Sequence, residues 1–490
     1  MFLSDARPLN RYAASFVLGA LMPLAFSPFN QAWLAPLLLA GWLAILMRGR
    51  AIGVGYAFGL GWFGMGAWWL APTLHTFGHL PWLLAAFCVL LVGGVMAALP
   101  AFLAWLCWRT AGRTAWVLLA FPAATVVEEW VRGHLFTGLP WTALGDLVLD
   151  TPAVGWGAWF GVYGVAALPA LAAATLVLLA MRNWRPAAAG LVTIVLLGWL
   201  APLPYAAGGD TYRATLVQGN IPQNLKWDSA FVDITMRRYA ALSASAPHSD
   251  VIIWPEATIP FFLAREPGWN RWLNKQIAVW HTPLLFGGLR LTGDGTAQNG
   301  LFADDPVETG RGGKRQFAGK QHLVPFGEYV PAWIPFLHTL VPEIANFQPA
   351  HDSGVVTVRG HRYGSLICYE SLFPEQSRSR VRQGAQVLVN ITNDAWYGKT
   401  PAAWQDFEAA RMRAVETGRY VLRAANTGIT AVIGPDGRVL ASLPWWTQGA
   451  LTAPYHLSDQ QTPYVRWGDW PLLTSLIMLV IALAGRRRDD

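Results

Sequence analysis

The sequence predicts a polytopic α-helical membrane bundle of about eight spans, with an α/β domain inserted before the last span. Three observations predict this fold class. The 490-residue chain is 54% hydrophobic, only 13% of its residues are charged, and it contains 27 tryptophans, a composition too apolar for an ordinary soluble protein of this length. Long apolar stretches recur along the N-terminal part of the chain, with basic residues at alternate ends. Residues 205–468, by contrast, have the turn signals and composition of a globular domain.

Eight apolar stretches are long enough to cross a bilayer at a rise of about 1.5 Å per residue. They lie at about residues 13–29, 32–47, 51–70, 83–108, 115–131, 153–181, 187–203 and 470–485. The chain therefore divides into three predicted parts. These are a membrane bundle at residues 1–204, an inserted domain at 205–468, and a closing span with a basic tail at 469–490.

Arginine residues predict the orientation of the bundle. They precede the first span and follow the second, fourth, sixth and eighth, at Arg7, Arg11, Arg48, Arg50, Arg109, Arg113, Arg182, Arg185, Arg486, Arg487 and Arg488. With eight spans, all these positions fall on one face, which the positive-inside rule assigns to the cytoplasm. Both termini are therefore expected in the cytoplasm and the inserted domain on the exported side. The net charge of +7 is then a topology signal, so no nucleic-acid partner is predicted.

Within the inserted domain, predicted strands alternate with predicted helices. Strands are expected near residues 216–218, 251–254, 355–358, 363–368, 386–391 and 429–433, and helices near 229–245, 269–280 and 401–417. This alternation predicts an α/β domain with a covered sheet. An apolar insert at 331–347 is expected to be either a core helix or a flap that lies on the membrane or over a lipid substrate.

Three residues with reactive or ionisable side chains follow predicted strands, where an α/β sheet collects functional groups. They are Glu256, Lys320 and Cys368. A cysteine nucleophile requires a base, and a nearby cation lowers the thiol pKa from about 8.5. Glu256 is suited to be the base and Lys320 the cation, which together with the N–H of Tyr369 would stabilise an oxyanion. Taken singly, each has a plainer interpretation, as a buried cysteine, a helix-capping carboxylate or a solvated lysine.

The motifs around these residues resemble the Glu-Lys-Cys site of the nitrilase (carbon–nitrogen hydrolase) superfamily. They are Trp254-Pro255-Glu256, Lys320 followed by His-Leu-Val-Pro-Phe-Gly-Glu at 322–328, and Cys368-Tyr369-Glu370. The wider pattern adds residues 219–223, 393–398 and 426–428 and the eight-span frame. In this form it resembles the apolipoprotein N-acyltransferase family over nearly the whole chain.

The resemblance implies a nitrilase-like α-β-β-α sandwich and a two-step acyl transfer. It implies that Cys368 is the nucleophile, Glu256 the general base and acid, and Lys320 the oxyanion partner. Four more positions match accessory, activity-linked or substrate-contacting residues: Glu328, Tyr369, Glu370 and Trp227. The implied acyl donor is a membrane phospholipid, typically phosphatidylethanolamine, and the acceptor is a diacylglyceryl-cysteine apolipoprotein. The implied location is the bacterial inner membrane with a periplasmic catalytic domain, and no cofactor or metal is expected.

The chemistry of the residues agrees with acyl transfer independently of the resemblance. A thiolate attacks an ester well, and a thioester can acylate an amine whose pKa is about 8. Water must be kept from the thioester, and the 331–347 insert and Trp396 are the candidates for excluding it. Two alternatives remain open: an exported amidase or nitrilase that uses the spans only as an anchor, and a non-enzymatic lipid-binding scaffold.

Three polar or glycine-rich features of the bundle are interpreted structurally. Residues 59–64 fit a GxGxxG pattern, but no strand precedes them, so we expect glycines that allow close helix packing. His75 and His79 lack a third ligand nearby, which argues against a metal site. Glu128, Glu129 and Arg132 are expected at the membrane interface, at the exported end of the fifth span.

Overall fold

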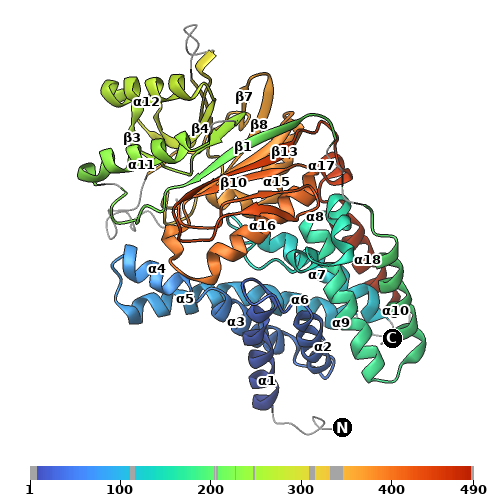
Figure 1. Cartoon of the computed structure of the whole chain (residues 1–490). Helices are drawn as coiled ribbons and strands as arrows, with labels where there is room; N and C mark the ends of the chain where they lie inside the picture. Colours follow the sequence, from blue (N-terminus) through green and yellow to red (C-terminus); the bar gives the residue numbers. More distant parts are fainter. Residues whose placement is uncertain are drawn as a thin grey trace. The chain divides into compact units, whose positions relative to one another are not determined.

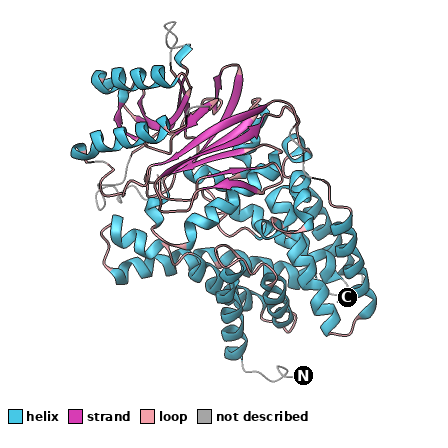
Figure 2. Ribbon diagram, viewed as in Figure 1, coloured by secondary structure: helices cyan, strands magenta, loops and turns pink. Residues whose placement is uncertain are grey.

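The chain forms two compact units in a computed structural model that describes residues 8–110, 116–203, 205, 208–226, 228–246, 249–307, 315–331 and 346–486. Unit 1 comprises residues 1–203, 400–408 and 467–490, and unit 2 comprises residues 204–399 and 409–466. The strands drawn in Figure 2 belong to unit 2. Trp227 and residues 332–345 of the predicted insert lie outside the described residues.

Unit 1 is built from helices, and a helix lies at each stretch where a span was predicted (Figure 1). The helices are α1 (Pro8–Leu21), η1 (Met22–Ala25), α2 (Leu34–Leu46), α3 (Ala51–Gly66), α4 (Leu70–Phe77), α5 (Trp82–Met96), α6 (Ala98–Thr110), α7 (Val117–His134), η3 (Leu144–Val148), η4 (Pro152–Trp156), α8 (Gly157–Val165), α9 (Ala167–Ala180), α10 (Trp184–Trp199) and α18 (Trp470–Arg486).

Most of these helices are shorter than the predicted spans. Among the described residues, one helical stretch, Trp82–Arg109, is long and apolar enough to cross a membrane by itself. Residues 152–165 and 167–180 meet the same criteria together, but they are bent by 71°. Helix α3 has 16 residues, a length of about 24 Å, whereas the hydrocarbon core of a bilayer is about 30 Å thick. The eight-span arrangement therefore stays a prediction.

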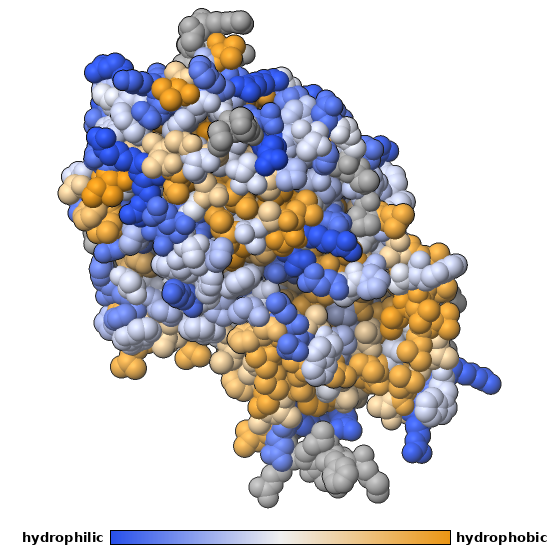
Figure 3. All heavy atoms as spheres, viewed as in Figure 1, coloured by the Kyte–Doolittle hydropathy of each residue, from blue (hydrophilic) through white to orange (hydrophobic). Residues whose placement is uncertain are grey.

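Large apolar side chains are exposed on several helices of unit 1. Leu83 of α5 is 88% exposed, Val195 of α10 is 67% exposed and Val480 of α18 is 64% exposed. Figure 3 shows hydrophobic side chains gathered over the lower part of the view, where the helices of unit 1 lie. Soluble proteins rarely expose contiguous apolar surface of this kind, which is suited to contact with lipid.

Glycines allow close packing of α1, α3 and α6. A Cβ atom at Gly19 would stand 1.9 Å from the Phe58 carbonyl oxygen, and one at Gly61 would stand 2.2 Å from that of Phe16. A Cβ at Gly59 would stand 2.7 Å from the Cα of Ala97. These approaches confirm that Gly59 and Gly61 serve helix packing, whereas a Cβ at Gly64 would have nothing within 4 Å.

The charged residues near the end of α7 are buried inside unit 1, which the expectation of an interfacial position did not anticipate. Glu128, Glu129 and Arg132 are 3%, 0% and 1% exposed. The Arg132 guanidinium donates to Glu129 Oε2 at 2.6 Å and to the carbonyl oxygens of Leu139 and Trp141. Because these carbonyls belong to the loop that follows α7, the network fastens that loop to the helix.

Unit 2 contains two β-sheets. The first has the strand order β13-β1-β2-β4-β5-β6, with β3 beside β4, and the second has the order β12-β11-β10-β9-β8-β7. The strands are β1 (Thr211–Gln218), β2 (Val251–Ile253), β3 (Ile259–Phe262), β4 (Leu284–Leu291), β5 (Ala297–Asp304), β6 (Gln316–Gly319), β7 (Val355–Val358), β8 (His361–Ile367), β9 (Val387–Thr392), β10 (Val421–Ala425), β11 (Ala431–Ile433), β12 (Val439–Ser442) and β13 (Gly449–His456).

The two sheets pack on one another, and helices cover their outer faces. One core cluster joins Leu216 and Ile253 of the first sheet to Ile367 and Val389 of the second. A second cluster packs α11 (Val232–Ala244) and α12 (Pro267–Trp280) on the first sheet. Helix α15 (Pro374–Arg382) and residues 409–417 of α16 (Pro401–Thr417), which belong to unit 2, lie along the second sheet (Figure 1). The predicted α/β domain is therefore confirmed, as an α-β-β-α arrangement.

Several strands had no signal in the sequence. The predicted strands at 355–358, 363–368 and 386–391 match β7, β8 and β9 closely, and β6 is the strand expected just before Lys320, whereas β5, β10 and β13 were not predicted. Strand β5 contains an Asn-Gly step, and β13 contains Pro454. Neither has the apolar alternation that marks a strand, so pairing with neighbouring strands overrides their weak propensity.

Candidate functional site

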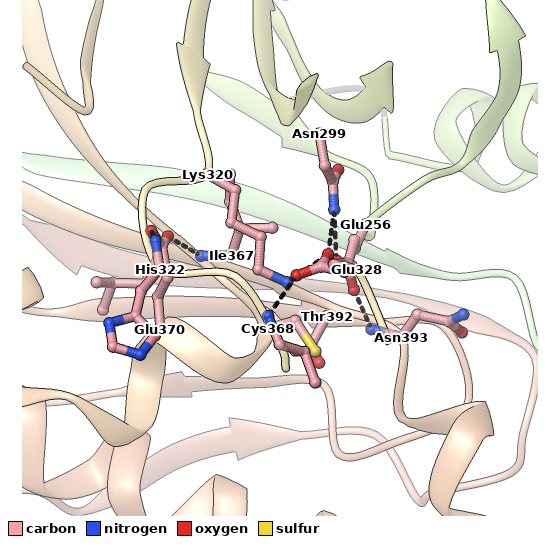
Figure 4. A network of polar contacts seen from close by, with 12 residues as sticks. Glu256, Asn299, Lys320, His322, Glu328, Ile367, Cys368, Glu370, Thr392 and Asn393 are labelled. Carbon is pink, nitrogen blue, oxygen red and sulfur yellow. Dashed lines mark hydrogen bonds and ion pairs between the residues drawn. The ribbon is translucent and has the colours of Figure 1, made fainter. Parts of the chain in front are cut away.

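The predicted site residues lie in loops that follow strands of both sheets, and their side chains converge (Figure 4). Glu256 comes three residues after β2, Cys368 directly after β8, and Lys320 directly after β6. The N–H of Asn393, which directly follows β9, donates to Glu256 Oε2 at 3.1 Å. This bond joins a loop of the first sheet to a loop of the second, so the site lies where the ends of the two sheets meet.

Cys368 occupies a constrained turn between β8 and the short helix η7 (Cys368–Leu372). Its φ angle is 51°, in the left-handed region, which costs a residue other than glycine on the order of 1–3 kcal/mol. The parallel pairing of Ile367 with Ile391 fixes the strand immediately before it. The thiol residue is 6% exposed. A reactive side chain at the end of a rigid strand is thereby held in one direction.

The carboxylate of Glu370 connects the cysteine turn to the lysine loop. Its Oε2 accepts the N–H of Ile367 at 2.8 Å, and its Oε1 accepts the N–H groups of Gln321 and His322 at 2.7 and 3.1 Å. Arg380 lies 3.5 Å from the same Oε1, and Glu370 is 0% exposed. Because Ile367 precedes Cys368 and Gln321 follows Lys320, one buried side chain sets the distance between these two segments.

Lys320 lies between two carboxylates. Its Nζ is 2.8 Å from Glu328 Oε1 and 3.6 Å from Glu256 Oε1, and the residue is 1% exposed. Burial by itself lowers the pKa of Lys320, but the charges of Glu328, Glu256 and Cys368 outweigh it, so the pKa stands above its ordinary value and the ammonium stays charged. Burial raises the pKa of Glu328, against the opposite effect of Lys320.

Asn299 also belongs to the site, although no sequence motif pointed to it. Its Nδ2 donates to Glu256 Oε1 at 2.8 Å and lies 3.4 Å from Glu328 Oε1. The main-chain carbonyl oxygen of Asn299 accepts the main-chain N–H of Lys320 at 2.8 Å. With Asn299 on one oxygen and the Asn393 N–H on the other, the Glu256 carboxylate is fixed in orientation. The Asn-Gly step that contains Asn299 resembles a turn, which hid its position in β5.

The three motifs at residues 219–223, 393–398 and 426–428 are connected through Asn426. Its side chain accepts the N–H of Ile221 at 2.9 Å and donates to the Ile221 carbonyl at 2.8 Å. It also donates to Asn393 Oδ1 at 3.0 Å, and Asn393 Nδ2 donates to Gln223 Oε1 at 2.7 Å. These bonds support the loop whose N–H contacts Glu256.

The remaining predicted residues have different settings. Tyr369 is 5% exposed, its ring meets that of Phe373 edge-on at 4.8 Å, and burial raises its pKa. Trp396 lies in the short helix η8 (Asp394–Tyr397) and is 39% exposed. Trp227 and most of the 331–347 insert lie outside the described residues, so their predicted roles stay predictions.

The arrangement contains the groups that nucleophilic acyl chemistry requires. It supplies a thiol, a fixed carboxylate to accept its proton, and an ammonium to stabilise negative charge. All three are buried, where such charges interact more strongly than in water.

Two family models match this chain. The model described as carbon-nitrogen hydrolase matches residues 213–462, and the model described as apolipoprotein N-acyltransferase N-terminal domain matches residues 18–175. Among solved structures, Nit3 of Saccharomyces cerevisiae, a member of branch 10 of the nitrilase superfamily, is 18% identical. The match covers 51% of this chain and 93% of the Nit3 chain, with a TM-score of 0.38.

Several relatives that match nearly the whole chain are named apolipoprotein N-acyltransferase. The chain is 37% identical to an apolipoprotein N-acyltransferase of Ralstonia nicotianae, over 98% of this chain and 94% of that protein. It is 37% identical to one of Methylococcus capsulatus, over 96% and 95% of the two chains. The similarity thus extends through the helical and the α/β parts alike, which does not favour an amidase that uses its helices only as an anchor. The chain belongs to the apolipoprotein N-acyltransferase family.

Proposed function

We propose that this bacterial membrane acyltransferase carries an acyl chain from a phospholipid, through a thioester on Cys368, to the N-terminal amine of a diacylglyceryl-cysteine apolipoprotein. The proposal also specifies phosphatidylethanolamine as the donor. The observation that carries it is the buried convergence of Glu256, Lys320 and Cys368, from three distant segments, in a chain of this family.

In the first step, the Cys368 thiol attacks the ester of the donor. Glu256 accepts the thiol proton while sulfur bonds to the carbonyl carbon, and the carbonyl electron pair moves to oxygen. Lys320 and the Tyr369 N–H stabilise this oxyanion. When the oxyanion collapses, the bond from carbon to the glycerol oxygen breaks. Glu256 returns its proton to that oxygen, and a lysophospholipid leaves.

In the second step, the acceptor amine attacks the thioester. An α-amine has a pKa of about 8, so a neutral fraction exists near pH 7. Glu256 accepts a proton from the attacking nitrogen, the carbon–sulfur bond breaks, and the proton returns to sulfur. The product is an amide, and the free thiol is restored. Trp396 is proposed to help exclude water, because hydrolysis of the thioester would waste the acyl chain.

The supporting residues act through the three reactive groups. Glu328 holds the Lys320 ammonium through its 2.8 Å ion pair, and Asn299 orients Glu256. Glu370 keeps the cysteine turn and the lysine loop at a fixed separation. These are positioning roles, because each of these side chains contacts a reactive segment and none carries a proton or a bond in the scheme.

For the membrane we propose eight spans, with residues 1–204 as a bundle, 205–468 in the periplasm and 469–490 as the closing span and cytoplasmic tail. The support is a helix at each apolar stretch, exposed apolar side chains on several of these helices, and the arginines at 7–11, 48–50, 109–113, 182–185 and 486–488, which flank the spans on one predicted face. Reporter fusions after residues 50, 110 and 181 should report the cytoplasm, and fusions after 205 the periplasm. A fusion that reports the opposite compartment would contradict this topology.

The thioester is tested on the full chain purified in detergent. We expect incubation with phosphatidylethanolamine to add the mass of one acyl chain at Cys368, in a bond that hydroxylamine cleaves. A diacylglyceryl-cysteine peptide should then remove the adduct. Cys88→Ala should behave as the native protein does, because Cys88 lies in α5 of the other unit. An adduct on Cys368→Ala, or none on the folded native protein, would rule out the mechanism, whereas equal use of phosphatidylglycerol would reject only the donor.

A further inference from the structure

A second buried lysine stands at the site, and the scheme above does not use it. Lys226 is 4% exposed, and its Nζ donates to the main-chain carbonyl oxygen of Glu256 at 2.8 Å. The bond links segments that are 30 residues apart. Lysine is rarely buried unless it is paired, so this position calls for an explanation.

The turn that carries Lys226 is fixed from the second sheet. Lys226 ends a turn that begins near Ile221, and its N–H lies 3.3 Å from the carbonyl oxygen of Gln223. Asn426 binds both main-chain groups of Ile221, and Asn393 binds the side chain of Gln223. From this support the lysine side chain reaches the Glu256 loop of the first sheet. The ammonium is thereby positioned by bonds on both sides of the site.

The loop that Lys226 contacts is itself constrained. Ala257, which follows Glu256, has a φ angle of 47°, in the left-handed region. A Cβ at Gly287 would stand 2.5 Å from the Glu256 Cα, so the backbones approach closely there. The hydrogen bond from Lys226 to the Glu256 carbonyl oxygen therefore fixes the peptide group that joins the strained Ala257 to Glu256.

The charges at the site give the second lysine an electrostatic effect as well. Lys226 interacts with Glu256 and Cys368, while Lys320 interacts with Glu256, Glu328 and Cys368. When all four groups are charged, the two positive charges of Lys226 and Lys320 balance the two negative charges of Glu256 and Glu328 before the Cys368 thiol ionises. If Lys226 were neutral or absent, a thiolate would form beside an uncompensated negative charge, which raises a thiol pKa.

We propose that Lys226 is a positioning residue of the acyltransferase site, which holds the main chain of Glu256 and stabilises the Cys368 thiolate. This inference rests on the proposed function, because it takes Cys368 to be the nucleophile. Burial lowers the pKa of Lys226 to about 8, despite the opposing charges of Glu256 and Cys368, so the ammonium predominates at neutral pH. Its effect on the thiolate is lost as the pH rises above that value.

The test measures the ionisation of Cys368 without any lipid. The full chain in detergent is alkylated with iodoacetamide at a series of pH values, and modification of the Cys368 peptide is followed by mass spectrometry. We expect Lys226→Met to move the midpoint of the rate profile upward by about one pH unit, with a several-fold lower rate at pH 7. Lys226→Arg should keep the midpoint at or below that of the native protein. Lys275→Met, which removes an exposed lysine of α12, is the matched control and should change nothing.

An unchanged midpoint in a folded Lys226→Met protein would overturn the proposal, because loss of a merely structural contact lowers rates without moving the profile. If Lys226→Met does not fold, Lys226→Arg is the deciding variant. A midpoint of its alkylation profile above that of the native protein would also overturn the proposal. The result is separate from the thioester test. A shifted midpoint in a native protein that forms no acyl adduct would reject the proposed function and keep the effect of Lys226 on the thiol.

Discussion

Replacing Glu370 tests whether one buried carboxylate sets the geometry of the site. In Glu370→Ala, the N–H group of buried Ile367 and the N–H groups of half-buried Gln321 and His322 lose their acceptor. A buried donor left without a partner costs about 1–3 kcal/mol, and a half-buried donor costs less, so the total is below about 9 kcal/mol. This approaches the whole stability of a typical domain, about 5–15 kcal/mol, and Glu370→Ala should accumulate poorly or unfold.

Glu370→Gln separates position from folding. The amide retains one oxygen acceptor and its shape, but it must turn its NH₂ group toward one of the two donor segments, Ile367 or Gln321–His322. We expect a loss of about 2 kcal/mol in the free energy of unfolding, and acylation of Cys368 at least tenfold slower than in the native protein.

The assay pairs thermal unfolding in detergent with the rate of acyl-adduct formation from phosphatidylethanolamine. Glu266→Gln, at an exposed position before α12, is the control and should alter neither quantity. A folded Glu370→Gln protein that acylates at the native rate would refute the reasoning, because the separation of the two segments would then not depend on the carboxylate.

Three further changes have directions that the structure fixes. Gly287→Ala places a Cβ 2.5 Å from the Glu256 Cα, so the free energy of unfolding should fall by about 1–3 kcal/mol or more and the rate of acylation should fall sharply. Gly268→Ala, with open space around the Cβ, is the control and should leave both quantities unchanged. Equal melting temperatures of the two variants would contradict this prediction. Lys320→Met removes the oxyanion partner, and acyl-adduct formation should slow by about 10²–10³-fold in single-turnover measurements; a loss below fivefold would exclude that role. Burial lowers the pKa of Lys226 to about 8, while an unfolded lysine titrates near 10.4, so between these pH values the unfolded state binds more protons than the folded state. The free energy of unfolding, measured by denaturant titration, should therefore rise with pH over this range by at most about 3 kcal/mol. Lys226→Met should remove that rise.

The reactive residues could be found in the sequence because their signals are local. Glu256, Lys320 and Cys368 each follow an apolar segment within a motif of a few residues, and a strand end is where a sheet presents functional groups. Buried strands such as β8 and β9 are apolar on both faces, which makes them visible without any partner. The glycines of α3 were likewise interpretable, since close helix packing requires small residues at a short spacing.

The partners of these residues were decided only by the tertiary structure. Asn299 and Lys226 have ordinary sequence surroundings, and they matter because strand pairing and loop contacts bring them to Glu256 across 43 and 30 residues. Asn426 and Ile221 are 205 residues apart, and Glu370 binds N–H groups 48 and 49 residues away. A hydrogen bond depends on position to within a fraction of an ångström, and that position follows from the register and packing of whole sheets. The sequence therefore determined which groups react, and the packing of the two sheets decided which groups hold them.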